Sequence, residues 1–133
     1  MKRILIVILI FAIGASAYTW FFVWNKPQLN VKNADAVKTE AAALFAAYST
    51  NEKAANANYI DKIVEVSGEA GTVSKNAEGL DVVFLKSNDP MFGIICTMEE
   101  KNTQIKAGDK VTLKGICTGY LTDVVLIRCY KTY

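Results

Sequence analysis

The longest hydrophobic segment of the chain runs from Ile4 to Trp24 without a charged residue and follows the basic pair Lys2 and Arg3. A helix of about twenty apolar residues can satisfy its backbone hydrogen bonds across the hydrocarbon core of a bilayer. Basic residues before such a segment favour a cytoplasmic N-terminus. The pattern therefore predicts a transmembrane signal anchor over residues 1–24, with the remaining domain outside the cytoplasm.

A cleaved secretory signal is the alternative, because the small residues Ala15, Ser16 and Ala17 are typical of a cleavage site. Cleavage there would leave an exposed apolar N-terminus beginning at Tyr18, which a soluble protein has reason to avoid. Aromatic residues at the end of the segment also suit the membrane interface. We expect the uncleaved anchor, and cleavage stays open as the second interpretation.

The next segment predicts a linker followed by helix. Residues 25–33 are polar and contain Pro27, as expected of a linker. Apolar residues then recur at three- and four-residue steps, which predicts a helix capped by Asn33. These residues are Ala34, Val37, Ala41, Leu44, Phe45 and Tyr48. Residues 34–59 are therefore expected to form a helical segment that packs on the following domain, with Leu44 and Tyr48 closing one of its ends.

From Lys62 onward, apolar and polar residues alternate, which is typical of strands with one buried face. Gly68 and Gly71 are expected to bend the first strand at the corner of a small barrel. The later strands are predicted at 80–86, 91–98, 110–118 and 124–130. Five short strands at this spacing predict a closed or nearly closed barrel over residues 60–133.

The alternation also assigns the two faces of the barrel wall. The predicted interior comprises Val64, Val66, Phe84, Ile94, Val111, Leu113 and Leu126. Lys114, which follows an interior position, is expected to point outward, so that its truncation would change stability little.

Composition narrows the range of functions. The chain has 15 basic and 13 acidic residues, and because Lys2 and Arg3 precede the membrane segment, the outward part carries 13 of each. This balance disfavours nucleic acid as a partner, since phosphate neutralisation requires basic residues. The chain contains no histidine, which removes the commonest general base and the commonest metal ligand. We therefore expect neither an enzyme nor a metal or cofactor site.

Several segments of the helical and strand regions form a characteristic set of motifs: residues 51–55, Tyr59, 62–68, 110–120, 123–126 and Cys129. Together they resemble the bacterial tRNA-anti-like family of OB-fold proteins, and the resemblance extends from about Asp35 to Tyr133. It implies a mainly β fold, a five-stranded OB-like barrel preceded by a helix. Members of the family are small envelope-associated proteins, and the family's function is uncharacterised. Many members are predicted lipoproteins. This chain has no cysteine for acylation near its N-terminus, which favours a single-pass anchor in the bacterial cytoplasmic membrane and a periplasmic domain.

Three cysteines, Cys96, Cys117 and Cys129, are an odd number for an oxidising compartment. In an OB barrel the last strand lies between the third and the fourth, which places all three on neighbouring strands. Cys117 and Cys129 flank the turn at Thr122 and Asp123, which predicts a disulfide if their side chains share a face. A Cys96–Cys117 bridge and three buried free thiols remain alternatives. A metal site on three thiolates lacks an evident fourth ligand.

OB barrels hold extended ligands on the face of their second and third strands. We therefore predict a membrane-tethered binding module for an oligosaccharide, a peptide or a partner protein. The predicted contacts are Lys75, Lys86, Asn88, Phe92 and Tyr120. Single-stranded nucleic acid, stacked on tyrosines of the same face, is one alternative ligand. A thiol redox role is another, and it would require a reactive Cys96.

Overall fold

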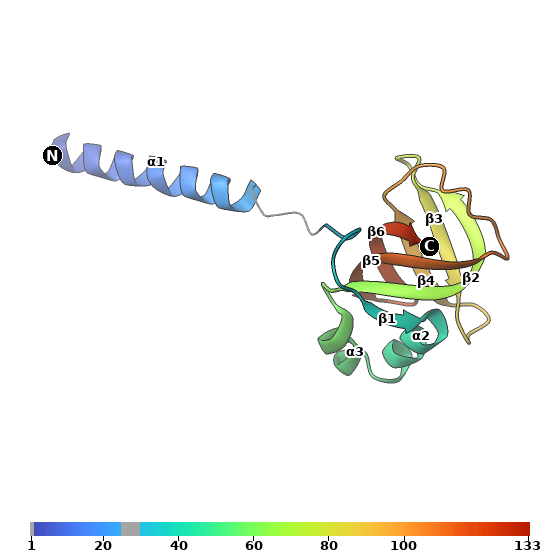
Figure 1. The fold of residues 1–133 in the computed structure, drawn as a ribbon. Helices are drawn as coiled ribbons and strands as arrows, with labels where there is room; N and C mark the ends of the chain where they lie inside the picture. The colour runs from blue at the N-terminus through green and yellow to red at the C-terminus, as the bar shows by residue number, and fades with distance from the viewer. Residues whose placement is uncertain (1, 25–29) are drawn as a thin grey trace.

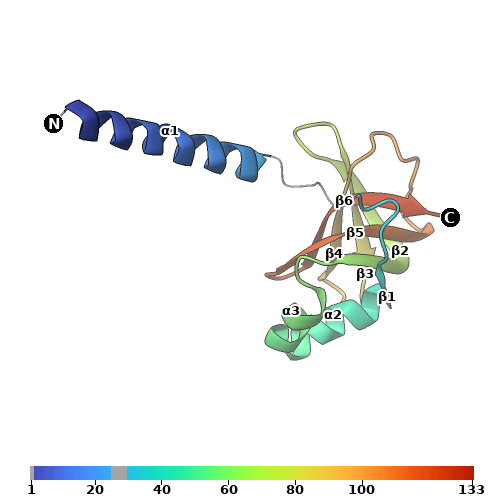
Figure 2. The ribbon, with the colours of Figure 1, turned by 60° about the vertical axis from the view of Figure 1, so that its left-hand side comes forward.

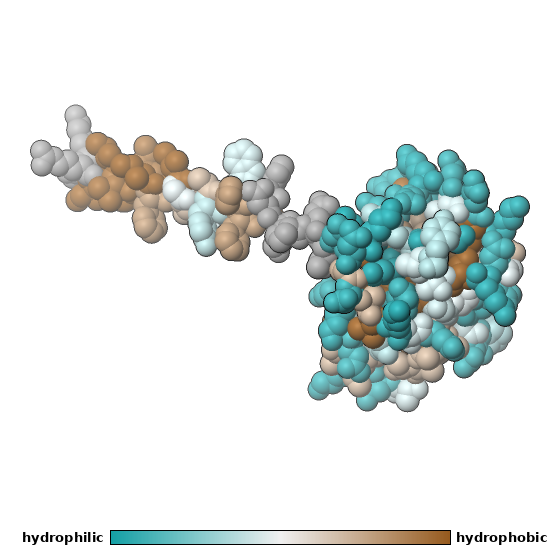
Figure 3. Space-filling model, viewed as in Figure 1, coloured by the Kyte–Doolittle hydropathy of each residue, from teal (hydrophilic) through white to brown (hydrophobic). Residues whose placement is uncertain are grey.

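The computed structural model describes residues 2–24 and 30–133, so residues 25–29 of the predicted linker lie outside the described part of the chain. Helix α1 (Lys2–Trp24) extends away from the remaining elements (Figure 1). Its segment from Ile6 to Val23 is long and apolar enough to cross a membrane, and none of it is buried. The helix contrasts with the largely hydrophilic surface of the domain in Figure 3. A signal sequence has the same length and composition, so both interpretations of this segment remain.

The domain is a closed barrel, as predicted (Figure 1). Its strands are β2 (Ile63–Lys75), β3 (Asp81–Lys86), β4 (Gly93–Met98), β5 (Lys110–Tyr120) and β6 (Val124–Thr132). They are hydrogen-bonded in the order β2-β3-β4-β6-β5, and pairing of β2 with β5 closes the barrel. The last strand thus lies between β4 and β5, which is the strand order of an OB fold.

Strand β2 closes the barrel because it changes neighbours along its length. From Ile63 to Glu69 it pairs with β5, and from Ala70 to Lys75 it pairs with β3. The register with β3 shifts between Ala70 and Thr72, so the extra residue is Gly71. A bulge of this kind sharpens the local twist and bends the strand. The corner predicted from Gly71 is therefore confirmed.

Residues 37–40 differ from the prediction, because they form a strand instead of the start of a helix. Strand β1 (Val37–Glu40) pairs in parallel with β2 from Val64 to Ser67. Strand β3 begins its pairing with β2 only at Ala70, so this stretch of β2 has a free edge that β1 fills. Satisfying those backbone groups outweighs the helical spacing of the apolar residues.

Two short helices cover one end of the barrel, opposite the long loops that join β2 to β3 and β4 to β5 (Figures 1 and 2). Helix α2 (Ala41–Thr50) buries Leu44 and Tyr48 against the core, as predicted. Helix α3 (Glu52–Tyr59) begins after Asn51, whose side chain accepts a hydrogen bond from the Ala54 N–H at 3.1 Å. This cap separates the two helices.

The barrel interior matches the predicted set with one exception. Val64, Val66, Ile94, Leu113 and Leu126 are fully buried, and Val111 is 6% exposed. The exception is Phe84, which is half-buried and faces outward, whereas its neighbours Val83 and Leu85 are fully buried. The run from Val82 to Leu85 is apolar at every position, so alternation alone could not decide which pair faces the core.

Lys114 also departs from its prediction, since it is only 9% exposed. Its ammonium group donates a hydrogen bond to the backbone carbonyl of Ala34. This contact, with the buried Val31 and an ion pair of 3.2 Å between Lys32 and Glu100, holds residues 30–34 on the barrel. Truncation of Lys114 would leave the Ala34 carbonyl without that donor, so it is not the neutral substitution that alternation suggested.

The structure does not support the predicted Cys117–Cys129 disulfide. All three cysteines are free and fully buried. Two residues of β6, Arg128 and Cys129, oppose the single residue Gly115 of β5, and Arg128 has a positive φ of 53°. This bulge places the Cys129 thiol against Gly115, where it is hydrogen-bonded with Cys96. Cys117 pairs with Leu126. Leu126 precedes Cys129 by three residues, so the two cysteines are not opposite each other in the hairpin and the register excludes the predicted pairing.

Candidate binding face

The outer surface of β2, β3 and β4 carries a shallow groove of about 380 Å³. Its lining comprises Thr72, Ser74, Val82, Phe84, Met91 and Ile95. Thr72 pairs with Phe84, which pairs in turn with Ile95, so these three side chains form a row across three strands. Ser74 and Val82 form a second row beside it. The groove thus presents apolar side chains bordered by two hydroxyls.

The apolar face arises from strands that are hydrophobic on both sides. Val83 and Leu85 fill the interior, and the intervening Val82 and Phe84 must then face outward because side chains alternate along a strand. Strand β4 repeats the pattern with Ile94 inside and the half-buried Ile95 outside. A strand that only covers a core normally exposes polar residues, so this outer face is a candidate for ligand contact.

Phe84 is the centre of the groove, and its ring lies between two glycines. A Cβ added at Gly71 would lie 3.1 Å from Cδ1 of Phe84, and one added at Gly93 would lie 2.8 Å from its Cζ. Any larger residue at either position would displace the ring. The glycines therefore let Phe84 lie close to the backbone of both neighbouring strands, where it offers a flat aromatic surface.

The two lysines predicted as contacts do not line the groove, and both are engaged by acidic partners. Lys75 lies 2.7 Å from Asp81 and also donates to the side-chain oxygen of Asn102. Hydrogen bonds from Lys75 and from the backbone N–H of Thr103 lower the pKa of Asp81. The Asp81 carboxylate thus pairs with the ammonium group of Lys75.

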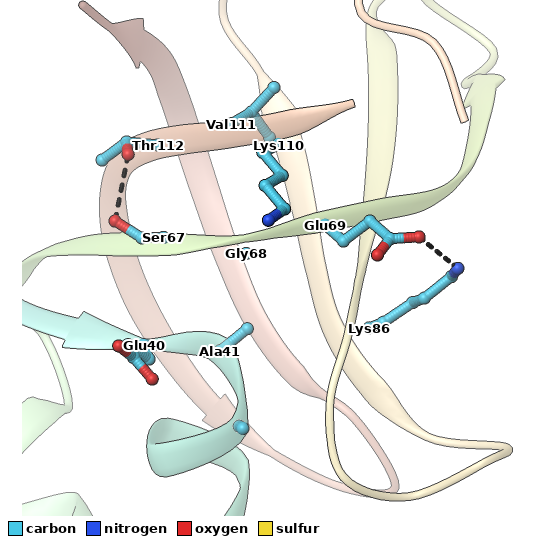
Figure 4. A pocket seen from close by; sticks show the side chains of 10 residues that line it. Glu40, Ala41, Ser67, Gly68, Glu69, Lys86, Lys110, Val111 and Thr112 are labelled. Carbon is cyan, nitrogen blue, oxygen red and sulfur yellow. Dashed lines mark hydrogen bonds and ion pairs between the residues drawn. The ribbon is translucent and has the colours of Figure 1, made fainter. Parts of the chain in front are cut away.

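Lys86 is paired in the same way with Glu69, and its hydrogen bond lowers the pKa of that carboxyl. The pair borders a second hollow of about 450 Å³ between the start of α2 and strands β2 and β5 (Figure 4). Ser67 and Thr112 are hydrogen-bonded to each other at 3.0 Å in its wall. The described residues contain no group of three potential metal ligands.

The five predicted contact residues are not brought together. Lys75 and Lys86 are held in the ion pairs described above, and Asn88 is exposed in the loop between β3 and β4. Phe92 packs partly buried against the core. Tyr120 stacks on Tyr48 of α2 at 5.6 Å between ring centroids. None of the five lines the groove on the outer surface of β3 and β4, so their role in binding stays a prediction.

Sequence reasoning missed Val82, Phe84 and Ile95 because it assigned one apolar face to each strand. The signal that could have found them was the presence of apolar residues at consecutive positions, 82–85 and 94–96. A continuous apolar run in a strand of a small barrel indicates burial of both faces. Here the described residues fully cover only the inner face.

The cysteines lie inside the barrel, away from solvent. The Tyr48 hydroxyl and the Cys117 thiol are 3.3 Å apart, and burial together with this contact raises the pKa of Tyr48. A hydrogen bond with Cys96 and burial raise the pKa of Cys129. Reactive thiols are typically accessible and have lowered pKa values. The alternative of a thiol redox role therefore receives no support from the surroundings of these cysteines.

Comparison with solved structures identifies a similar fold in a "putative nucleic acid-binding lipoprotein" from Klebsiella pneumoniae. The two structures superpose with a TM-score of 0.58 at 14% sequence identity, over 72% of this chain and 92% of the other. No curated protein sequence matches the chain. The family model tRNA_anti-like matches residues 1–131. The resemblance seen in the sequence is thus confirmed over almost the whole length, and the chain belongs to the tRNA_anti-like family.

Proposed function

We propose that this protein is a membrane-tethered, extracytoplasmic binding module that holds an extended apolar segment of a partner protein in the groove centred on Phe84. The observation that carries the proposal is the apolar outer face of β3 and β4. It coincides with the face that OB barrels use for extended ligands. In this proposal the protein positions a partner and catalyses no reaction.

A peptide suits the groove better than a glycan. Successive side chains of an extended peptide point to opposite sides, so alternate apolar residues can contact Val82, Phe84 and Ile95. Thr72 and Ser74 lie beside them and supply hydroxyls for the peptide backbone. A glycan would require many directional hydrogen bonds, and the centre of the groove provides none.

Single-stranded nucleic acid is the second candidate, favoured by the flat ring of Phe84. Proteins that bind single-stranded nucleic acid stack its bases on aromatic rings and contact its phosphates through a basic groove. The six residues that line the groove include no lysine or arginine, and Lys75 and Lys86 are both in ion pairs. Residues 30–133, which exclude Lys2, Arg3 and Lys26, contain 12 basic and 13 acidic residues. These charges favour the peptide over the nucleic acid.

Binding to the full-length chain in lipid nanodiscs tests the proposal. Peptides selected from a displayed random library should carry apolar residues at alternate positions. Their affinity should fall at least tenfold in Phe84→Asp, because a carboxylate in the groove must be desolvated on binding. The matched variant Ile127→Asp, at an outward position of β6 that is 37% exposed, should bind as the wild type does.

The nucleic-acid alternative has a distinct signature in the same assay. An oligothymidine of about 15 nucleotides would bind more weakly as salt increases, because its binding releases counterions. Salt-sensitive binding of that probe, abolished by Phe84→Asp, together with no selected peptide, would overturn the peptide proposal.

The proposed location has its own test. A reporter enzyme that is active only outside the cytoplasm, fused after Tyr133, should be active, because Lys2 and Arg3 favour retention of the N-terminus inside. The fusion should also stay in the membrane during a carbonate wash. An inactive reporter would contradict the orientation. An active fusion released by the wash would indicate cleavage of the N-terminal segment.

A further inference from the structure

Met91 brings a sulfur atom to the groove centred on Phe84. It lies in the loop between β3 and β4, lines the groove and is 76% exposed. A thioether that solvent reaches is open to oxidation, which converts an apolar side chain into a polar sulfoxide. The groove therefore contains a wall residue whose polarity an oxidant in solution can change.

The other sulfur atoms of the described residues are shielded from solvent. Cys96, Cys117 and Cys129 are fully buried, and Met98 is 1% exposed. A hydrogen bond with Cys96 and burial raise the pKa of Cys129, which keeps it in the less reactive thiol form. Within residues 2–24 and 30–133, Met91 is thus the one sulfur-containing side chain exposed to solvent.

Hydrogen bonds within its loop hold Met91 beside the groove. The Asp89 carboxylate accepts hydrogen bonds from the backbone N–H groups of Met91 and Phe92, at 2.8 and 3.0 Å. The Ser87 hydroxyl donates to the carbonyl of Phe92 and accepts from the N–H of Asp89. These contacts fix the backbone from which the Met91 side chain reaches the groove.

Oxidation changes the surface that a bound segment contacts. A thioether is apolar and flexible, so it can adapt to apolar side chains of different shapes. A sulfoxide oxygen is instead a hydrogen-bond acceptor, and the apolar side chains of β3 and β4 in the groove carry no donor for it. Covering that oxygen with an apolar segment costs free energy, so oxidation opposes binding.

We propose that Met91 is a site of reversible oxidation by peroxide, and that its sulfoxide weakens binding in the groove. The Met91 sulfur attacks one oxygen of hydrogen peroxide, an S–O bond forms and the O–O bond breaks. The sulfur loses two electrons, and the second oxygen takes up the proton of the first and leaves as water. Methionine sulfoxide reductases reverse the change with two electrons from thiols. This inference rests on the proposed function, because it regulates binding in the same groove.

Peroxide treatment of the full-length chain in lipid nanodiscs, followed by mass spectrometry, tests the modification. Met91 and Met98 lie in the same tryptic peptide, residues 87–101, so its fragment masses locate the added oxygen. Oxygen should be added to Met91 about tenfold faster than to the buried Met98, or faster still. Equal rates at the two methionines, or faster oxidation of a cysteine, would overturn the proposal.

The tightest-binding peptide selected from the displayed library reports the effect on the groove. Its affinity should fall about tenfold after peroxide treatment and recover after incubation with a methionine sulfoxide reductase. In Met91→Leu, which has a similar volume without the sulfur, peroxide should not change the affinity. The matched variant Met98→Leu should lose affinity on oxidation as the wild type does. Unchanged affinity of the oxidised wild type, or the same loss in Met91→Leu, would contradict the proposal.

A measurement without a peptide separates this proposal from the proposed function. In the isotope-labelled full-length chain in detergent micelles, oxidation of Met91 should shift the backbone amide signals of Phe84 and Ile95, which share the groove with it. The amide signal of Ile127, on the outer face of β6, should stay unchanged. Failure of every peptide to bind the untreated protein would contradict the proposed function alone. Unchanged signals of Phe84 and Ile95 would overturn the oxidation proposal whether or not a peptide binds.

Discussion

Leu113→Ala is expected to lower the free energy of unfolding by about 2 to 5 kcal/mol, a large share of the stability of a domain of this size. Leu113 is fully buried in the barrel wall, opposite Val66 of β2. Its truncation removes apolar contacts and leaves a cavity that rigid strands cannot readily close. Urea denaturation of the full-length chain in detergent, followed by a spectroscopic signal of the β-domain, measures the change.

The matched control for this variant is Leu121→Ala. Leu121 is 89% exposed at the turn between β5 and β6, so the same truncation should change the free energy of unfolding by less than about 0.5 kcal/mol. Equal effects at the two positions would contradict the burial of Leu113 in the barrel interior.

Gly93→Ala should destabilise the domain by about 3 kcal/mol or more, because the added methyl group meets backbone. A Cβ at Gly93 would lie 2.2 Å from the carbonyl oxygen of Leu85 on the paired strand. The strands β3 and β4 would have to separate to admit it. The variant should also lose peptide binding, since the same methyl group would lie 2.8 Å from the ring of Phe84.

Thermal or urea denaturation measures the effect of Gly93→Ala against Gly14→Ala. An added Cβ at Gly14 meets no atom within 4 Å, and Gly14 lies in α1, outside the barrel. That control should leave the unfolding of the β-domain unchanged. Unfolding of Gly93→Ala at the wild-type midpoint would mean that β3 and β4 do not pair as described.

The barrel could be predicted because its strands alternate in the usual way. Val64, Val66, Leu113 and Leu126 stand at alternate positions of long strands, and each is fully buried. Alternation fails where both faces are apolar, as at Phe84. The outward direction of that ring follows only from the pairing of β3 with its neighbours, which a single strand does not encode.

Local irregularities account for the other differences. The bulge at Arg128 changes which face of β6 carries Cys129. The sequence pattern did not predict this bulge, because Arg128 is not a residue type that usually has a positive φ. Strand β1 exists because β2 has a free edge beside it, which is a tertiary property. Consecutive apolar residues could have indicated strands with two apolar faces, but how residues of three strands combine into one groove depends on their register, which is also a tertiary property.

The most direct measurement of the central claim is photo-crosslinking in cells that produce the full-length protein. A benzophenone amino acid replaces Phe84 in the groove, and the same residue replaces Ile127 on the outer face of β6 as the control. The account predicts adducts from position 84 that protease removes, that nuclease leaves intact, and that are absent from position 127. Nuclease-sensitive adducts at position 84, or equal adducts at both positions, would contradict the claim that this groove binds a protein segment.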